Sequence, residues 1–184
     1  MNLNYKLFFK YILFNSTFLF LNNVIKNRKI INLFITQNYF YFLSLHFKFS
    51  TFFYHSQLSD IFAYELPINI NNKKSFTPSS IVVYNFHNMG FQQRFFIFTL
   101  KDNTTYSYLK SITELFPNSS WLEREVSELH SINFEGKKDL RNLMLQYGDT
   151  SSPFRKSYPS IGTKEMFYDG LNDLIVQSPV SIQV

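Results

Sequence analysis

The sequence predicts an α+β fold, in which helices pack on a mixed β-sheet between an N-terminal helical extension and a long irregular C-terminal arm. Short runs of β-branched and aromatic residues alternate with stretches of helical periodicity. With 184 residues, 45% of them apolar, the chain can bury a core without disulfides or a structural metal. We expect the extension over residues 1–29, the core domain over 30–150 and the arm, packed on a partner, over 151–184.

The extension has the pattern of one broad apolar helix face. From Leu3 to Ile25, apolar residues recur at spacings of three and four. Lys10 and Asn22 bracket the apolar run, which is shorter than the ~20 residues that a membrane span needs. An amphipathic helix that lies on a partner or a membrane surface is therefore favoured over a transmembrane helix.

Strands are expected at the start of the core domain. Ile30–Ile35 reads as a strand, and a helix or a strand follows it through Phe49. The segment Gln57–Pro67 reads as extended. Residues 69–80 are rich in Asn, Lys, Ser and Pro and are predicted to form a loop.

A hairpin is expected at the centre of the sheet. Ile81–Phe86 and Arg94–Leu100 are predicted strands joined through Gly90. Both are apolar on both faces, which is typical of central strands with layers above and below.

Helices should follow the hairpin. Leu109, Ile112 and Phe116 share a helix face, and Pro117 would end that helix. Ser120 and Glu123 then form the Ser-x-x-Glu pattern of a capping box. The pattern predicts a second helix from Trp121, with one apolar face, formed by Leu122, Val126 and Leu129.

The last part of the chain carries weaker signals. Ile132–Phe134 is a brief extended stretch, and Asp139 is a candidate cap for a short helix that Gly148 would stop. Beyond it the arm contains several prolines and few helix signals, with a candidate hairpin around Asp169–Gly170.

Composition points to the genome rather than to an activity. The chain has 23 Phe and 12 Tyr but five Gly and a single Ala, Ala63. Phe, Tyr, Asn, Ile and Lys have A/T-rich codons, so the bias favours an A/T-rich genome such as an organellar one. The abundance of aromatic residues then says little about function.

Several classes of site are excluded. The chain has no cysteine, so it carries no disulfide scaffold, no thiolate-bound iron–sulfur cluster and no Cys-type zinc site. The five glycines never take the spacing of a phosphate-binding loop. Four scattered histidines suggest no metal pair; they are His46, His55, His87 and His130.

Residues 112–159 resemble a known family. Ile112–Pro117 followed by Trp121–Val126 is similar to the family's Phe-Pro-x-x-x-Trp-x-Glu-Arg-Glu segment. Ile132–Gly136 is similar to its Gly-Ile-x-Phe-x-Gly element. The further matches are Asp139-Leu140-Arg141, Tyr147-Gly148, Pro153–Pro159 against Pro-Leu-Arg-Lys-Asp-Phe-Pro, and, upstream, Leu58–Glu65 against Leu-Thr-Asp-x-x-Ala-Val-Asp.

In this order, the motifs resemble the thirty-kilodalton subunit of respiratory complex I, the NADH–ubiquinone oxidoreductase, which is also called its C subunit or subunit nine. The resemblance covers residues 57–184. Ser127–Ser131 departs from the family's Trp-Asp-Met-Phe-Gly, Lys137-Lys138 from its His-Pro, and Ser151-Ser152 from its Gly-His. These departures concern local contacts and leave the family match intact.

The resemblance implies a non-catalytic core subunit in the hydrophilic arm of mitochondrial complex I, on the matrix side of the inner membrane. The codon bias adds the expectation that the chain is encoded in the organelle. Such a subunit braces the forty-nine-kilodalton quinone-site subunit during NADH-to-ubiquinone electron transfer and proton pumping. It binds no cofactor itself; NADH, FMN, iron–sulfur clusters and ubiquinone belong to the parent complex.

The family motifs also supply candidate partner-contacting residues. Arginines and carboxylates alternate through them, and Arg can hold a carboxylate in a bidentate fork. Ordinary surface charge is an equally good interpretation of this pattern. The candidates are Glu123, Arg124, Glu125, Asp139, Leu140, Arg141, Tyr147, Gly148, Arg155, Lys156 and Pro159.

Charge distribution keeps other functions open. The net charge is +5, but six basic residues and no acidic ones precede Asp60, and twelve basic against thirteen acidic residues make up the rest. The basic first third can contact anionic lipid, RNA or an acidic neighbour. An RNA-binding protein of an organellar ribosome and a small membrane protein are therefore the alternative functions.

Overall fold

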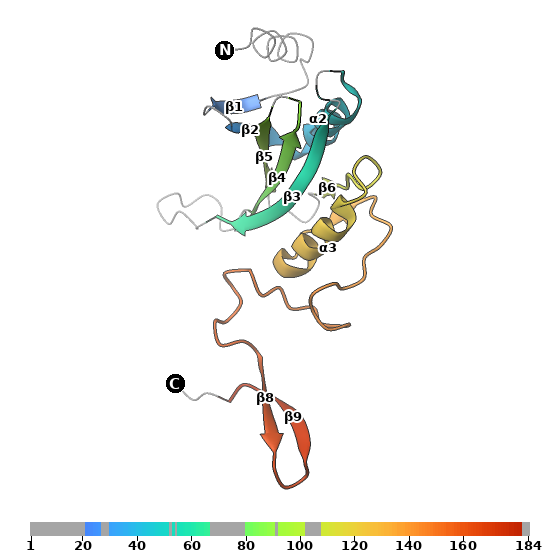
Figure 1. Cartoon of the computed structure of the whole chain (residues 1–184). Coiled ribbons are helices and arrows are strands. Elements are labelled where there is room, and N and C mark those ends of the chain that lie inside the picture. The colour runs from blue at the N-terminus through green and yellow to red at the C-terminus, as the bar shows by residue number, and fades with distance from the viewer. Residues whose placement is uncertain are drawn as a thin grey trace, which may run out of the picture.

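The fold is a five-stranded mixed sheet with two helices packed on it (Figure 1). A computed structural model describes residues 21–26, 30–51, 53, 55–66, 80–90, 92–101 and 108–181. The strand order is β1-β2-β5-β4-β3, with β2 parallel to β5 and the other pairs antiparallel. The strands are β1 (Leu21–Lys26), β2 (Ile30–Thr36), β3 (Ser56–Glu65), β4 (Ser80–Asn88) and β5 (Gln93–Lys101). The predicted α+β class is confirmed.

The predicted hairpin is β4–β5, and it occupies the centre of the sheet as expected. Its register pairs Tyr84 with Ile97 and Phe86 with Phe95, all fully buried. Strand β3 pairs with β4 across a bulge between Leu58 and Asp60. The predicted loop over residues 69–80 lies almost entirely outside the described residues.

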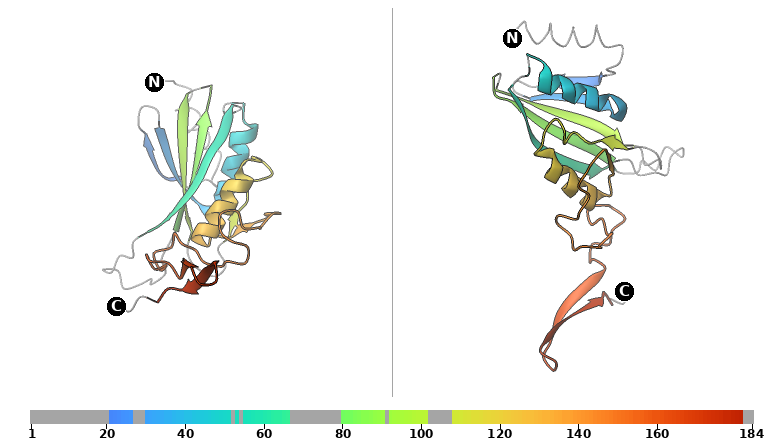
Figure 2. Two further views of the ribbon diagram at one scale, coloured as in Figure 1. Left: turned by 60° about the horizontal axis from the view of Figure 1, so that its bottom comes forward. Right: turned by 90° about the vertical axis from the view of Figure 1, so that its right-hand side faces the viewer.

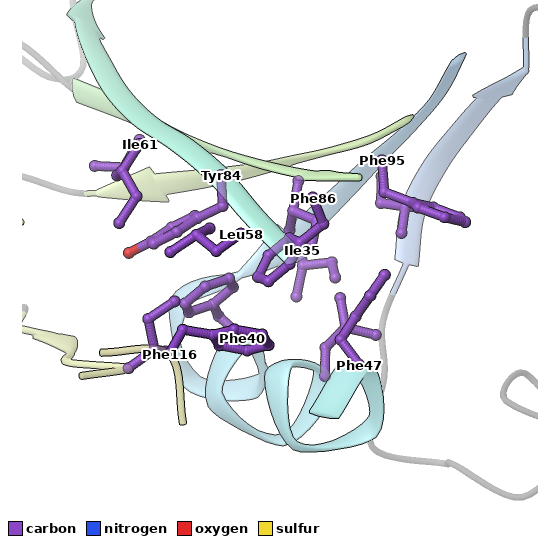
Figure 3. Packing of buried hydrophobic residues seen from close by; sticks show 14 of the residues in the cluster. Ile35, Phe40, Phe47, Leu58, Ile61, Tyr84, Phe86, Phe95 and Phe116 are labelled. Carbon is purple, nitrogen blue, oxygen red and sulfur yellow. The ribbon is translucent and has the colours of Figure 1, made fainter. Parts of the chain in front are cut away.

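The segment that could be a helix or a strand is helix α2 (Gln37–Phe49), which follows β2 directly. Its apolar side chains recur at helical spacing, so Phe40, Leu43 and Phe47 all face the sheet. Phe40 stacks on Tyr84 with ring centroids 3.9 Å apart, and Phe47 lies against Phe86 at 4.9 Å (Figure 3). These contacts form the centre of the core.

The sequence predicts that both faces of the sheet are covered, and the described residues confirm a covering layer on one face. Among the described residues, α2 and α3 (Ser119–His130) both contribute to the core on the same face (Figure 2). The opposite face has its own apolar row, in which the rings of Phe34 and Phe98 stack at 4.8 Å. Phe62 and Leu100 in this row are exposed.

The predicted helix over Leu3–Ile25 is wrong at its C-terminal end. Leu21–Lys26 forms β1, an edge strand antiparallel to β2. Whether a segment forms an edge strand depends on the strand beside it, and the spacing of apolar residues within the segment does not contain that information. The rest of the predicted helix lies outside the described residues, and in the described part no helix is long and apolar enough to cross a membrane.

The predicted helix through Leu109, Ile112 and Phe116 is also wrong. Leu109–Lys110 is strand β6, which pairs in parallel with β7 (Phe134–Glu135). One helical turn follows, closed by a 2.9 Å bond from the Phe116 N–H to the Ile112 carbonyl. All three apolar residues are buried nonetheless, so their spacing identified core positions correctly and the backbone conformation incorrectly.

Helix α3 begins two residues earlier than the capping box indicates. Asn118 occupies the cap position without a side-chain cap hydrogen bond, and the Glu123 carboxylate bonds to the segment after β6 instead of closing the box. The predicted inward face is confirmed for Val126 and Leu129, which are buried. The helix ends at His130, and its C-cap residue, Ser131, adopts the left-handed conformation.

The segment after β7 has no helix, contrary to the prediction over residues 139–148. Several of its backbone groups bond to side chains of α3. The predicted hairpin in the arm is confirmed as β8 (Lys164–Asp169) and β9 (Leu174–Pro179). It projects away from the sheet (Figure 1).

We predict that Phe47→Ala lowers the free energy of unfolding by about 3–5 kcal/mol, because it removes a ring packed on Phe53, Phe86 and Phe95. Chemical denaturation of the purified chain measures this. Phe49→Ala, in the same helix but 73% exposed, is the matched control and should change stability by less than about 1 kcal/mol. Equal effects would contradict this account of the core.

Candidate functional site: the α3 network and the loop it holds

Glu123 is a carboxylate buried at the start of α3. It is 0% exposed and accepts hydrogen bonds from the Ser111 hydroxyl at 2.7 Å and the Ile112 N–H at 2.9 Å. These bonds attach α3 to the segment that follows β6. A buried charge without partners would cost several kcal/mol, so this side chain fixes the position of the helix only while all its partners are present.

Lys137 supplies the balancing charge. Its ammonium lies 3.5 Å from the Glu123 carboxylate and donates to the Ser120 carbonyl at 2.8 Å. Its side chain is 1% exposed. Burial lowers the pKa of Lys137 below its usual value, and the charge of Glu123 opposes this. The pair ties the chain after β7 to the first turn of α3.

Arg124 holds the next segment through its backbone carbonyls. Its guanidinium donates to the Arg141 carbonyl at 2.8 Å and to the Asn142 carbonyl at 3.1 Å, and it lies 3.5 Å from Asp139. The side chain is only 10% exposed. Arg124, one of the candidate partner-contacting residues, thus orders the backbone of its own chain.

Glu128, one turn further along α3, binds the same segment through its backbone N–H groups, whereas Arg124 binds its carbonyls. Its carboxylate accepts the backbone N–H groups of Leu143 at 2.9 Å, Met144 at 3.0 Å and Leu145. Burial opposes ionisation, but the three backbone donors outweigh it and hold the pKa of Glu128 below its usual range. Arg124 and Glu128 are four residues apart, so both project from one side of the helix.

Residues 139–147, here called the presenting loop, carry large apolar side chains into solvent. Leu140 is 71% exposed, Met144 62% and Tyr147 82%. The loop has no regular secondary structure, and the Arg124 and Glu128 bonds supply backbone partners that a helix or a sheet would otherwise provide. The arrangement is suited to presenting an apolar surface in one fixed shape.

Asp139 and Arg141 form a pair at the edge of this loop. The Arg141 guanidinium donates to both Asp139 oxygens at 3.0 Å. This side-chain bond, with one from the Arg141 N–H and the charge of Arg124, holds the pKa of Asp139 well below its usual value. Because the Arg141 side chain is 73% exposed, the pair contributes little to stability.

The remaining predicted site residues lie apart from this network. Lys156 donates its backbone N–H to Glu65 at 2.7 Å, while its side chain is exposed, as is Pro159. Burial lowers the pKa of Lys101, and the positive charge of nearby Arg155 lowers it further. Gly148 has a φ of 84°, which favours glycine, and Glu125 is half-buried on α3.

Two residues of the network are not among the predicted site residues. In the sequence, Glu128 is one acid of a charged helix edge, and Lys137 is a departure from the family pattern. Their roles depend on what lies opposite them, at sequence separations of 14 to 17 residues. The spacing of Arg124 and Glu128 on one helix side is the signal that could have found Glu128.

The described residues contain no group of three His, Cys, Asp or Glu side chains that could hold a metal ion. The recess lined by Arg124, Glu128 and Lys137 has a volume of ≈ 50 Å³, room for a few water molecules. A more open hollow of ≈ 310 Å³ lies against Lys137, Lys138 and Asp139. What the contacts of this region do is hold the backbone of the presenting loop in place.

We predict that Glu123→Gln lowers the free energy of unfolding by about 3–5 kcal/mol, because it leaves the Lys137 ammonium buried without a counter-charge. Adding Lys137→Met should recover most of the loss, as measured by chemical denaturation in a double-mutant cycle. Glu125→Gln, two residues away and half-buried, is the control. A loss below about 1 kcal/mol for Glu123→Gln would show that the buried pair does not hold α3.

Comparison with known proteins gives the family. A family model described as "Respiratory-chain NADH dehydrogenase, 30 Kd subunit" matches residues 43–164. The C subunit of NADH-quinone oxidoreductase from Methylobacillus flagellatus is 36% identical over 100 residues, covering 54% of this chain and 51% of the relative. The protein of the same name from Thiobacillus denitrificans is 42% identical over 73 residues, covering 40% and 36%. The chain thus spans about half of the first relative's length and less of the second's.

A solved structure agrees on the fold. A chain from the structure of the membrane-bound sulfane sulfur reductase, an archaeal respiratory membrane complex, superposes with a TM-score of 0.67. It is 14% identical, and the match covers 86% of this chain and 87% of the other. The family model matches more than half of the chain and includes α3, its buried network and the presenting loop. The chain therefore belongs to the family of the 30 kDa subunit of the respiratory-chain NADH dehydrogenase.

Proposed function

We propose that this chain is a non-catalytic structural subunit in the hydrophilic arm of mitochondrial complex I, where it braces the forty-nine-kilodalton quinone-site subunit. It takes part in NADH-to-ubiquinone electron transfer and proton pumping only by supporting that assembly. NADH, FMN, iron–sulfur clusters and ubiquinone are held by other subunits. Family membership supports the assignment to the complex.

The presenting loop is the observation that carries the structural role. Its exposed side chains Leu140, Met144 and Tyr147 are held out by Arg124 and Glu128, both on α3. Large apolar side chains gathered at a surface mark protein interfaces, and aromatic residues and Met are enriched in their cores. A loop kept in shape by the chain's own charges loses little entropy on docking.

Location in the organelle is supported by composition. The scarcity of Ala and Gly beside abundant Phe, Tyr, Asn, Ile and Lys fits an A/T-rich organellar gene. The relatives are bacterial, and a bacterial ancestry agrees with such a gene. We place the chain on the matrix side of the inner membrane, with its basic N-terminal third near acidic partners or anionic lipid. Arg124, Lys137 and Arg141 each lie beside a carboxylate of this chain, an arrangement that does not favour RNA binding.

The first test is native electrophoresis of gently solubilised mitochondrial membranes, stained in the gel for NADH dehydrogenase and followed by mass spectrometry. We expect peptides of this chain in the large stained band and not in lighter fractions. Migration with ribosomal proteins, or alone at low mass, would overturn the assignment.

The second test separates bracing from catalysis. We expect Arg124→Ala to weaken association of the chain about tenfold, because it frees two backbone carbonyls of the presenting loop. We expect Arg155→Ala, in the arm, to lower assembly as well. Turnover per assembled complex should stay near normal in both.

Lys110→Ala, which removes the positive charge of an exposed residue outside the network, is the control and should assemble normally. Normal assembly of the two arginine variants together with a collapse of specific turnover would indicate a catalytic role.

A further inference from the structure

The β8–β9 hairpin is a preformed element with few contacts to the other described helices and strands. Its strands pair in full register from Lys164–Pro179 to Asp169–Leu174, and the Val180 N–H closes the base on the Thr163 carbonyl at 3.2 Å. β8 packs on β9, and neither strand packs extensively on another described helix or strand. Two views show it standing clear of the sheet (Figures 1 and 2).

Both faces of this hairpin are apolar and exposed. Because side chains alternate along a strand, Met166, Tyr168 and Ile175 lie on one face, at 68%, 63% and 76% exposure. Phe167 and Leu174 lie on the other, at 51% and 61%. A hairpin that lay on a flat surface would need only one such face.

The turn is built by the chain itself. The Asp169 carboxylate accepts the Leu171 N–H at 3.0 Å and an Asn172 side-chain N–H at 2.7 Å, and the Tyr168 hydroxyl donates to Asp173. Leu171, at the tip, is 97% exposed. The turn is therefore shaped before any partner arrives, and it leads with an apolar side chain.

An isolated two-stranded hairpin is marginally stable in water, and it gains stability when an apolar face is covered. If only the face of Phe167 and Leu174 were covered, three large apolar side chains would stay in water, and if only the opposite face were covered, two would. Both faces are removed from solvent only if the hairpin lies between two walls of a cleft. The hairpin residues 164–179 also carry three acidic side chains and one basic one, which suits walls bordered by Lys or Arg.

We propose that the β8–β9 hairpin inserts, tip first, into a two-walled apolar cleft that is bordered by basic residues and formed by partner subunits of the same complex. The inference rests on the proposed function for the identity of the assembly. It goes beyond it because it assigns the hairpin a buried, two-sided seat rather than a place on a partner's surface.

Hydroxyl-radical footprinting of the native complex, with mass spectrometry at single residues, tests this without altering the chain. We expect Met166 and Ile175 on one face and Phe167 and Leu174 on the other to be oxidised at least about tenfold more slowly in the complex than in the dissociated chain. Met89, in the turn after β4, is 53% exposed and serves as the reference methionine, because its oxidation reports the radical dose against which oxidation of Met166 is compared.

Protection of one face only would overturn the two-walled cleft, and protection of neither would overturn docking of the hairpin. Native electrophoresis distinguishes failure of this proposal from failure of the proposed function. If the proposed function is wrong, the chain is missing from the NADH-stained band, whatever the footprint shows.

Variants give an independent measurement. Phe167→Ser and Ile175→Ser, on opposite faces, should each reduce the assembled fraction about tenfold. Gln177→Ser, an exposed polar position in the same strand as Ile175, should leave it within about twofold. If only one of the two apolar variants reduced assembly, the two-walled seat would be wrong.

Discussion

The buried carboxylate of Glu123 is the constraint on which the arrangement of the chain from α3 onward depends. Its partners are the hydroxyl of Ser111, the N–H of Ile112 and the ammonium of Lys137, so one group joins three segments that are separate in the sequence. A charge in this position is tolerated only if every partner is present. The orientation of α3 is thereby fixed, and the side chains further along the helix acquire fixed directions.

From α3 onward, polar bonds replace apolar burial as the source of order. Arg124 satisfies two carbonyls and Glu128 satisfies three N–H groups of a loop that has no ladder of its own. The apolar side chains are consequently available for a partner instead of a core. The sheet around Phe47 and Tyr84 shows the opposite division, with apolar contacts inside and the helix α2 as cover.

The entropy of association explains why the exposed apolar surfaces are preformed. The presenting loop and the β8–β9 hairpin both have their backbone conformations set by carboxylates of this chain, Glu128 and Asp169. Ordering a segment in advance reduces the conformational entropy lost on association. A subunit that supplies only contacts gains its affinity from such preorganisation together with the area it buries.

The sequence alone predicts the strands β2 to β5, the central hairpin, the arm hairpin and the family, because these depend on local alternation, turn residues and short motifs. It also identified Leu109, Ile112 and Phe116 as core positions. Contacts between distant segments make Leu21–Lys26 an edge strand and β6 a strand, and they leave residues 139–148 without a helix. In each case the backbone bonds to a partner outside the segment itself, and a local pattern of apolar and polar residues cannot encode that partner.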